Sequence, residues 1–199
     1  MNFKDIDFSK VASILNSMSD EEKENLQKMA QDMMHEKEEE AEEETDFFEF
    51  LQIQEEDYTN LPGTVLDQME AAADLEQYYE EDMDADFSGS VLFYAKAMLN
   101  VLRKYHYEVY RDVLNLSQSV STTTLYSFLA PLMQEGTIRT LVDAGHGTME
   151  DWIFHRDSLQ NVAILLSRAE YDRVGFQEVQ MLKDILFNKK AILNAEEVI

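Results

Sequence analysis

The sequence of 199 residues contains no cysteine, two prolines and six glycines. The lack of cysteine excludes disulfides, thiolate catalysis and cysteine-ligated zinc. Because turn-forming residues are few and β-branched residues rarely alternate with polar ones, a sheet-rich fold is not expected. No apolar run approaches the roughly 20 residues that cross a bilayer, and the N-terminus lacks the apolar stretch of a secretory signal. We therefore expect a cytoplasmic protein with no membrane partner.

The apolar content indicates a packed helical core. Hydrophobic residues make up 45% of the chain and aromatic residues 11%, which is too apolar for wholesale disorder. Helical spacing of apolar residues is strongest after residue 87. The sequence predicts an all-α fold with two parts. Residues 88–199 form a helical bundle, and residues 1–87 form an acidic, partly helical and partly flexible interaction region.

Four or five helices are predicted in the bundle. The first is expected to start with Ser88 as its cap and to run to Val113. Another begins after Thr148, and the last extends from Glu170 to Asn194.

Negative charge is concentrated in the first part of the chain. Residues 1–87 contain 28 Asp or Glu and 5 Lys or Arg, a net charge of −23. Residues 88–199 contain 13 and 11, a net charge of −2, and the two values sum to the −25 of the whole chain. Such a charge opposes binding to phosphate backbones or anionic lipids and favours basic partners. We therefore expect no direct binding of nucleic acid.

The acids have no basic neighbours in sequence, because no Lys or Arg occurs between Lys37 and Lys96. Neutralising charge must come from the C-terminal part, from ions or from a partner. We expect Lys96, Arg103 and Arg111 to meet the acidic half within the molecule. A solvated acidic face and a docking surface for a cationic protein both remain open as interpretations.

Two patterns of apolar residues in the acidic half are suited to binding a partner protein. Met29 and Met33 lie on one side of a predicted helix, and methionine adapts to irregular grooves. A second segment places bulky apolar residues between glutamates, as in segments that fold on binding. Packing on the protein's own core is an open alternative for both, and for the second segment it is the favoured one. The predicted partner-binding residues are Met29, Met33, Phe47, Phe48, Phe50 and Leu51.

One segment partly matches a calcium loop of the EF-hand kind. Asp84, Asp86, Ser88 and Gly89 occupy positions 1, 3, 5 and 6, but position 12, which requires a bidentate Glu, is Ala95. The alternative is a helix start with aspartates near the positive end of the helix dipole. We favour the helix start.

A second candidate for metal binding is the region of His146 and His155, with Asp143 and Asp151 nearby. Asp151 and His155 are one helical turn apart, but the spacing matches no strong metal signature. His155 also falls on the apolar face of Trp152, which predicts a hydrogen-bonded core histidine. No metal or cofactor is therefore expected.

Residues 103–111 interleave basic and aromatic side chains, the ingredients of a nucleic-acid platform. On a helix these side chains point in several directions, and their spacing is that of ordinary surface pairs. No nucleophile elbow, phosphate loop, dinucleotide fingerprint or zinc-protease helix occurs.

The leading hypothesis is a non-enzymatic adaptor or regulatory protein that binds a basic protein partner through its acidic N-terminal region. The first alternative is a metal- or small-molecule-dependent helical enzyme. The second is an inhibitor that mimics duplex DNA, because closely spaced carboxylates on helices imitate a phosphate ladder.

Overall fold

The computed structural model describes residues 46–199 apart from residues 80, 81 and 83. All regular secondary structure in this part of the chain is helical, which confirms the all-α prediction. None of the described helices combines the length and the apolar character that a membrane-spanning helix needs. The predicted helices before residue 46, and with them Met29 and Met33, lie outside the described residues.

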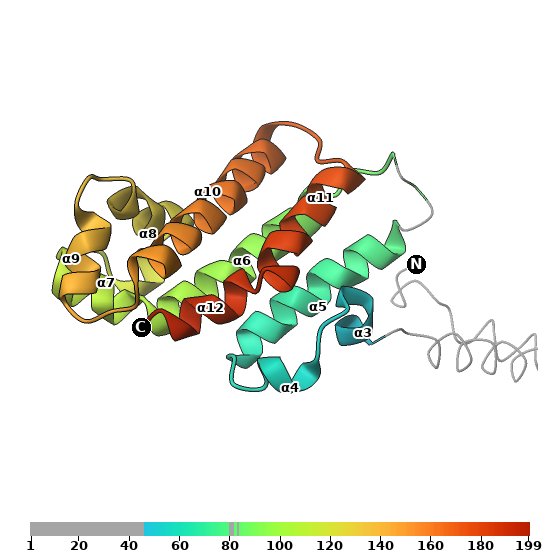
Figure 1. The fold of residues 1–199 in the computed structure, drawn as a ribbon. Helices are drawn as coiled ribbons and strands as arrows, with labels where there is room; N and C mark the ends of the chain where they lie inside the picture. Colours follow the sequence, from blue (N-terminus) through green and yellow to red (C-terminus); the bar gives the residue numbers. More distant parts are fainter. Residues whose placement is uncertain (1–45, 80–81, 83) are drawn as a thin grey trace, which may run out of the picture. The chain divides into compact units, whose positions relative to one another are not determined.

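Figure 1 shows how the helices of the described residues follow one another along the chain. They are α3 (Phe47–Leu51), α4 (Glu55–Tyr58), α5 (Gly63–Tyr78), α6 (Ser88–Tyr105), α7 (Tyr107–Leu114), η2 (Val120–Thr122), α8 (Leu125–Leu132), α9 (Thr137–Asp143), α10 (Met149–Tyr171), α11 (Phe176–Lys183), the π-helical turn η3 (Asp184–Asn188) and α12 (Ala191–Glu197).

Helix α6 lies at the centre of the bundle. It contacts α5, α10, α11 and α12, and Figure 1 shows the three longest helices, α5, α6 and α10, running side by side. Its central position follows from its sequence, because small or apolar side chains occupy most of its circumference. The buried residues of α6 are Ser90, Val91, Tyr94, Ala95, Ala97, Met98, Val101 and Leu102.

Residues 46–87 belong to the same compact unit as the predicted bundle, and this unit spans residues 46–199. Val65, Met69 and Ala72 of α5 are fully buried, at the spacing of one helical face. Gly89 permits a close approach of α5 and α6, since a Cβ at this position would lie 3.0 Å from Leu75 Cδ1. The packed bundle therefore starts well before the predicted division at residues 87 and 88.

The bundle has seven α-helices after residue 87, more than the four or five predicted. The predicted helix from Ser88 to Val113 is two helices, α6 and α7, which meet at His106. The predicted last helix is also divided, and Lys190, with a φ of 57°, precedes α12. Buried contacts and left-handed residues set these breaks, so apolar periodicity alone did not reveal them.

The helix start at Thr148 is confirmed. The Thr148 hydroxyl accepts a hydrogen bond from the Asp151 amide at 3.2 Å, and the Asp151 carboxylate accepts one from the Thr148 amide at 3.0 Å. This reciprocal pair satisfies two amides that the first helical turn leaves without partners.

Candidate functional site

The acid-rich segment of the described chain runs from residue 46 to residue 87. Among the described residues, its acids form ion pairs with two cations, both from the C-terminal part of the bundle. Lys183 Nζ lies 3.1 Å from Glu76 Oε2, and Lys190 Nζ lies 3.3 Å from Asp57 Oδ2. The expectation that the C-terminal part would supply neutralising charge is met at these two positions.

The three cations predicted for this role make other contacts. Lys96 Nζ lies 4.8 Å from the centroid of the Phe93 ring. Arg103 donates hydrogen bonds to the Thr123 carbonyl and hydroxyl oxygens. Arg111 pairs with two acids on its own helix, α7. The prediction for Lys96, Arg103 and Arg111 was wrong for the described acids of residues 46–87, because each side chain reaches another partner, and its outcome for residues 1–45 lies outside the described residues.

The outer face of α5 carries exposed carboxylates. Asp67, Glu70 and Asp74 are all exposed and follow one another at intervals of three and four residues, so they lie on one side of the helix. Tyr78 continues the same side and is 81% exposed. Together with exposed Glu55 and Glu56 on α4, these residues define what we call the acidic face. The helical spacing of these acids can be seen in the sequence. Their exposure could not be predicted, because the sequence does not show which side of α5 packs on α6.

The predicted aromatic anchors pack against the bundle. Phe47, Phe48 and Phe50 are half-buried and lie on the core, and Leu51 is only 4% exposed. The Phe50 ring also lies beneath the Lys183 ammonium, with Nζ 4.3 Å from the ring centroid. In this arrangement Leu51 has almost no surface for a partner, and the three phenylalanines are only partly exposed.

Glu76 is the one buried acid among the described residues of this segment, and it connects three helices. Its Oε1 accepts a hydrogen bond of 2.5 Å from the Tyr94 hydroxyl on α6, and its Oε2 accepts bonds from Lys183 and Gln180 on α11. Burial raises the pKa of the Glu76 carboxyl, and the lysine and the hydrogen bonds oppose that rise. Burial and the nearby carboxylate hold the pKa of Tyr94 well above its usual value. The cluster ties the acid-rich segment to the C-terminal helices.

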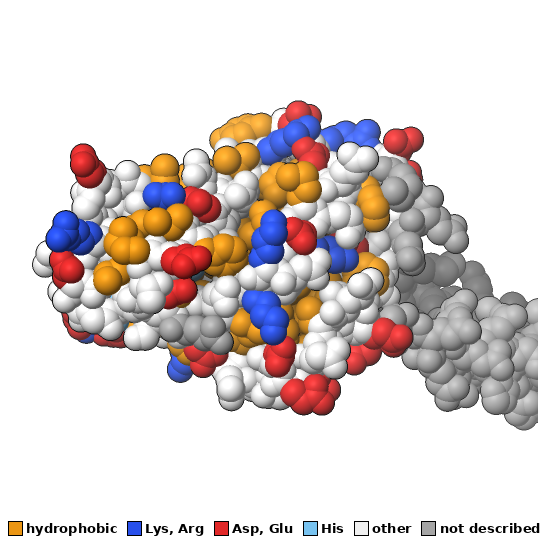
Figure 2. Space-filling model, viewed as in Figure 1, with side chains coloured by type: hydrophobic (Ala, Val, Ile, Leu, Met, Phe, Trp, Pro, Cys, Tyr) orange, Lys and Arg blue, Asp and Glu red, His pale blue; other side chains and the backbone are white. Residues whose placement is uncertain are grey.

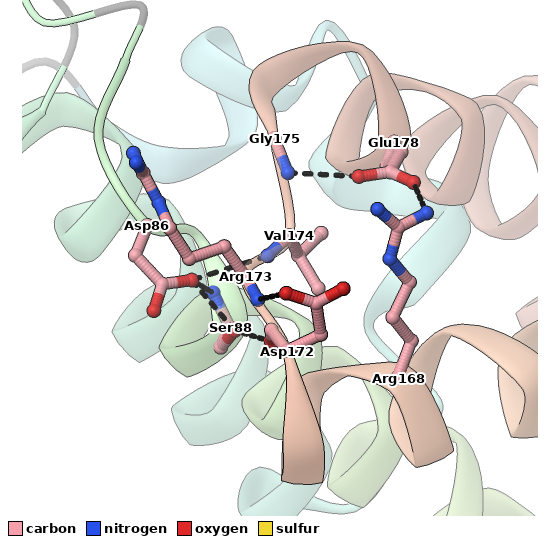
Figure 3. A network of polar contacts seen from close by, with 8 residues as sticks. All are labelled: Asp86, Ser88, Arg168, Asp172, Arg173, Val174, Gly175 and Glu178. Atoms are coloured by element: carbon pink, nitrogen blue, oxygen red, sulfur yellow. Dashed lines mark hydrogen bonds and ion pairs between the residues drawn. The ribbon is translucent and has the colours of Figure 1, made fainter.

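The partial calcium loop is a helix start and a clamp, shown in Figure 3. Asp86 Oδ1 accepts hydrogen bonds from the Ser88 amide, the Ser88 hydroxyl and the Val174 amide. Ser88 is the first residue of α6 and is not its cap, since Asp86 accepts the bond from its amide. The Phe87 amide donates to the Val174 carbonyl at 2.9 Å. These bonds attach the α10–α11 connection to the start of α6.

The rest of this network holds α11 in place. The Glu178 carboxylate accepts a hydrogen bond from the Gly175 amide and pairs with Arg168 of α10 (Figure 3). Hydrogen bonds from Ser88 and from backbone amides lower the pKa of Asp86. The contacts drawn in Figure 3 join residues of α6, α10 and α11 and the segments between them.

His146 and His155 do not come together as a metal site. His155 is fully buried and stacks on His106, with ring centroids 4.5 Å apart and ring planes 19° apart. The nitrogen lone pairs of two stacked imidazoles lie in nearly parallel planes, so they do not converge on one ion between the rings. Within the described residues, no three His, Asp or Glu side chains gather as a ligand set. The prediction of a core histidine holds for His155, although its Nε2 has no hydrogen-bond partner there.

His106 is the residue that sequence reasoning missed. It appeared only as one member of the basic and aromatic run of residues 103–111, whereas its side chain is completely buried. The run is also not a continuous platform, because Tyr110 is buried and Tyr107 donates a hydrogen bond to the Gln118 carbonyl.

Two larger hollows lie on the surface of the described part of the chain. One, of about 450 Å³, lies between the α7–α8 connection and α8, and its lining from Leu114 to Gln134 contains no charged and no fully buried residue. The other, of about 420 Å³, lies along α11 and η3, where exposed Met181 adjoins Lys189. Figure 2 shows hydrophobic and basic side chains next to one another over this side of the bundle. Neither hollow gathers a cluster of catalytic acids, bases or metal ligands.

Comparison with known proteins adds no relative. No protein-family model matches the chain, and neither a curated protein nor a solved structure resembles it significantly. The fold and the site define a helical bundle with an acidic face, and the function must be argued from that geometry.

Proposed function

We propose that this protein is a non-enzymatic interaction protein whose acidic region binds a basic protein partner. The observation that carries the proposal is the acidic face of α4 and α5. Asp67, Glu70 and Asp74 form an exposed row on α5, and none of them has an ion pair among the described residues. Uncompensated carboxylates in a row attract a cationic surface and accelerate its association.

The acidic face supplies an anchor as well as charge. Tyr78 lies at the end of the row and is 81% exposed, and its ring packs edge-on against Tyr79, with centroids 4.9 Å apart. Tyrosine is enriched among residues that dominate binding energy, and its ring attracts Lys and Arg cations. Tyr78 is better placed than Leu51 to meet a partner, and Met29 and Met33 remain predicted anchors in the segment before residue 46.

The test compares two triple variants of the full chain. The first, Asp67→Asn with Glu70→Gln and Asp74→Asn, removes three charges from the acidic face. The control, Glu135→Gln with Glu150→Gln and Glu170→Gln, removes three exposed charges from other elements. Proteins bound from a cell extract are quantified by mass spectrometry, and the association rate of the main partner is then measured at several salt concentrations.

We expect basic proteins to dominate the bound fraction and the first variant to lose them. The control should retain them, and binding by the natural chain should slow as salt rises, since surface charges are screened within about 8–10 Å at 0.1–0.15 M salt. Equal binding by both variants, or a partner whose affinity ignores salt, would exclude the acidic face as the binding surface. Competition by duplex DNA for the partner would assign the protein to the DNA-mimic alternative.

A further inference from the structure

Two histidines are stacked in the core where α6, α10 and α12 meet. His106 lies between α6 and α7, His155 lies on α10, and both are essentially without solvent contact. Trp152 packs edge-on against both rings, at centroid distances of 5.4 and 5.6 Å. Tyr110 lies 6.1 Å from His106. The pair is therefore enclosed by aromatic rings.

Helix α12 closes one side of this enclosure. His106 Nε2 lies 2.5 Å from the Ala195 carbonyl oxygen, so in the neutral ring the proton resides on Nε2 and is donated to α12. Close packing continues at the end of the helix. A Cβ on Gly147, whose φ is 53°, would lie 2.9 Å from the Val198 carbonyl oxygen.

Three polar atoms around the histidine pair lack hydrogen-bond partners in the described part of the chain. His106 Nδ1, His155 Nε2 and the Tyr110 hydroxyl are buried, and none has a hydrogen-bond partner among the described residues. A second proton on either ring would create a buried N–H donor and a buried charge, both of which are costly without a partner.

No described carboxylate compensates such a charge. On α10, the Asp151 carboxylate is hydrogen-bonded to Thr148. On α12, Glu196 is directed to the Tyr105 hydroxyl, whose pKa it raises together with burial. The cations of α6 that lie nearest in sequence are exposed Lys104 and Arg103, which is bound to Thr123.

Tyr110 of α7, whose ring lies next to His106, is a further titratable neighbour of the pair, and burial keeps its hydroxyl protonated by holding its pKa well above the usual value. Burial lowers the pKa of His106 to about 4, against the bond to Ala195, which raises it. Burial and the neighbouring His106 hold the pKa of His155 well below the usual value. Both rings are therefore neutral at pH 7.

We propose that α12 is an acid-released latch, which stays closed only while the stacked histidines His106 and His155 are neutral. To hydrate a protonated ring, one covering element must move away. Helix α12, with seven residues, is shorter than α6, α7 and α10 and is joined to η3 through Lys190 in the left-handed conformation. It is the covering element that is tied to the pair by a hydrogen bond, so its release exposes a histidine nitrogen to water, and we expect it to open before the bundle unfolds.

The latch is tested on the full chain by amide hydrogen exchange followed by mass spectrometry, with intrinsic exchange rates corrected at each pH. As the pH falls from 6.5 towards 4, the opening constant of α12 should rise about tenfold per pH unit for each proton that the open state takes up. Peptides of α5 should keep their protection over this range. Emission from Trp152, the only tryptophan, should shift with α12.

A double variant isolates the histidines. His106→Gln keeps a donor near the Ala195 carbonyl, and His155→Leu keeps an apolar side chain of similar size, so the pair no longer titrates. This variant should lose the opening of α12 between pH 6.5 and 4, and His146→Gln, as the matched control, should retain it. If the double variant is poorly folded, His106→Gln alone should reduce the pH slope.

Two outcomes would overturn the latch. In the first, α5 and α12 lose protection at the same pH, which means that acid unfolds the whole bundle. In the second, α12 opens with the same pH dependence in the histidine variants as in the natural chain, which assigns the response to other groups.

Discussion

Two clusters of buried polar side chains in the bundle differ in how they offset the cost of removing polar groups from water. In the cluster of Glu76, Tyr94 and Lys183, a charged carboxylate is surrounded by donors and a cation. In the pair of His106 and His155, charge is avoided and polar atoms are left without partners among the described residues. The first cluster is stable only while Glu76 keeps all its partners, because the loss of a partner leaves a charge in the core without compensation. The second is stable only while both imidazoles are neutral.

The two clusters also differ in what they connect. Glu76 joins α5 to α6 and α11, and so holds the helix of the acidic face on the bundle. The histidines join α6 and α10 to α12. The helix that carries the acidic face is thus fixed by a charged cluster and α12 by a neutral one, so we expect acid to affect them differently.

The largest expected effect comes from removing the cation of the charged cluster. Lys183→Met leaves Glu76, which is 3% exposed, without its ion-pair partner, and the free energy of unfolding at pH 7 should fall by about 3–5 kcal/mol. Chemical denaturation monitored by circular dichroism measures this loss. The double variant Lys183→Met with Glu76→Gln should recover most of it. A single variant as stable as the natural chain would show that the carboxylate is already neutral.

An intermediate effect is expected from pH, with opposite signs in the two clusters. The raised pKa of Glu76 means that its contribution is fully present below its ordinary value of 4.5 and is lost as pH rises through the folded value. The lowered pKa of His106 means that its contribution is present above 6.5 and is lost as pH falls towards about 4.

Stability measured between pH 4.5 and 6.5 should separate these contributions. Each histidine steepens the loss on acidification by up to about 1.4 kcal/mol per pH unit, and Glu76 opposes it. The Glu76→Gln variant should therefore lose more stability on acidification than the natural chain, and the His106→Gln variant should lose less. Changes of the same sign in both variants would contradict the assignment.

The helical class followed from composition and periodicity, because α5, α6 and α10 each repeat apolar residues at helical intervals. The boundary of the bundle did not follow, since the charge balance changes at residue 87 while the packing begins at α3. Charged residues indicate which side of a helix is exposed to water, but they do not show whether its other side is packed. Helix α5 has an acidic exposed side and an apolar side that is buried in the core. A shift in composition therefore did not mark a shift in packing.

The contacts of the candidate site were even less accessible from sequence. Lys183 and Glu76 are 107 residues apart, and His106 and Ala195 are 89 residues apart, so no local pattern relates them. Acids and aromatics interleaved around Phe47 and Phe50 fit both partner binding and self-packing. The contact that shows packing within the molecule is the one between Lys183 and the Phe50 ring, and Lys183 lies on α11, far from Phe50 in the sequence.

The smallest effect is expected at the second ion pair of the acid-rich segment. Lys190 and Asp57 are 57% and 48% exposed at their side chains, so water and salt screen their attraction. A double-mutant cycle with Lys190→Ala and Asp57→Ala should give a coupling of about 0–1 kcal/mol that decreases in high salt. This pair has the same charges as Lys183 and Glu76 at a similar distance, so the contrast measures burial together with the further contacts that the buried pair makes with Tyr94 and Phe50. A coupling as large as that of the buried pair would mean that the turn at Lys190, and not solvent exposure, determines the strength of the contact.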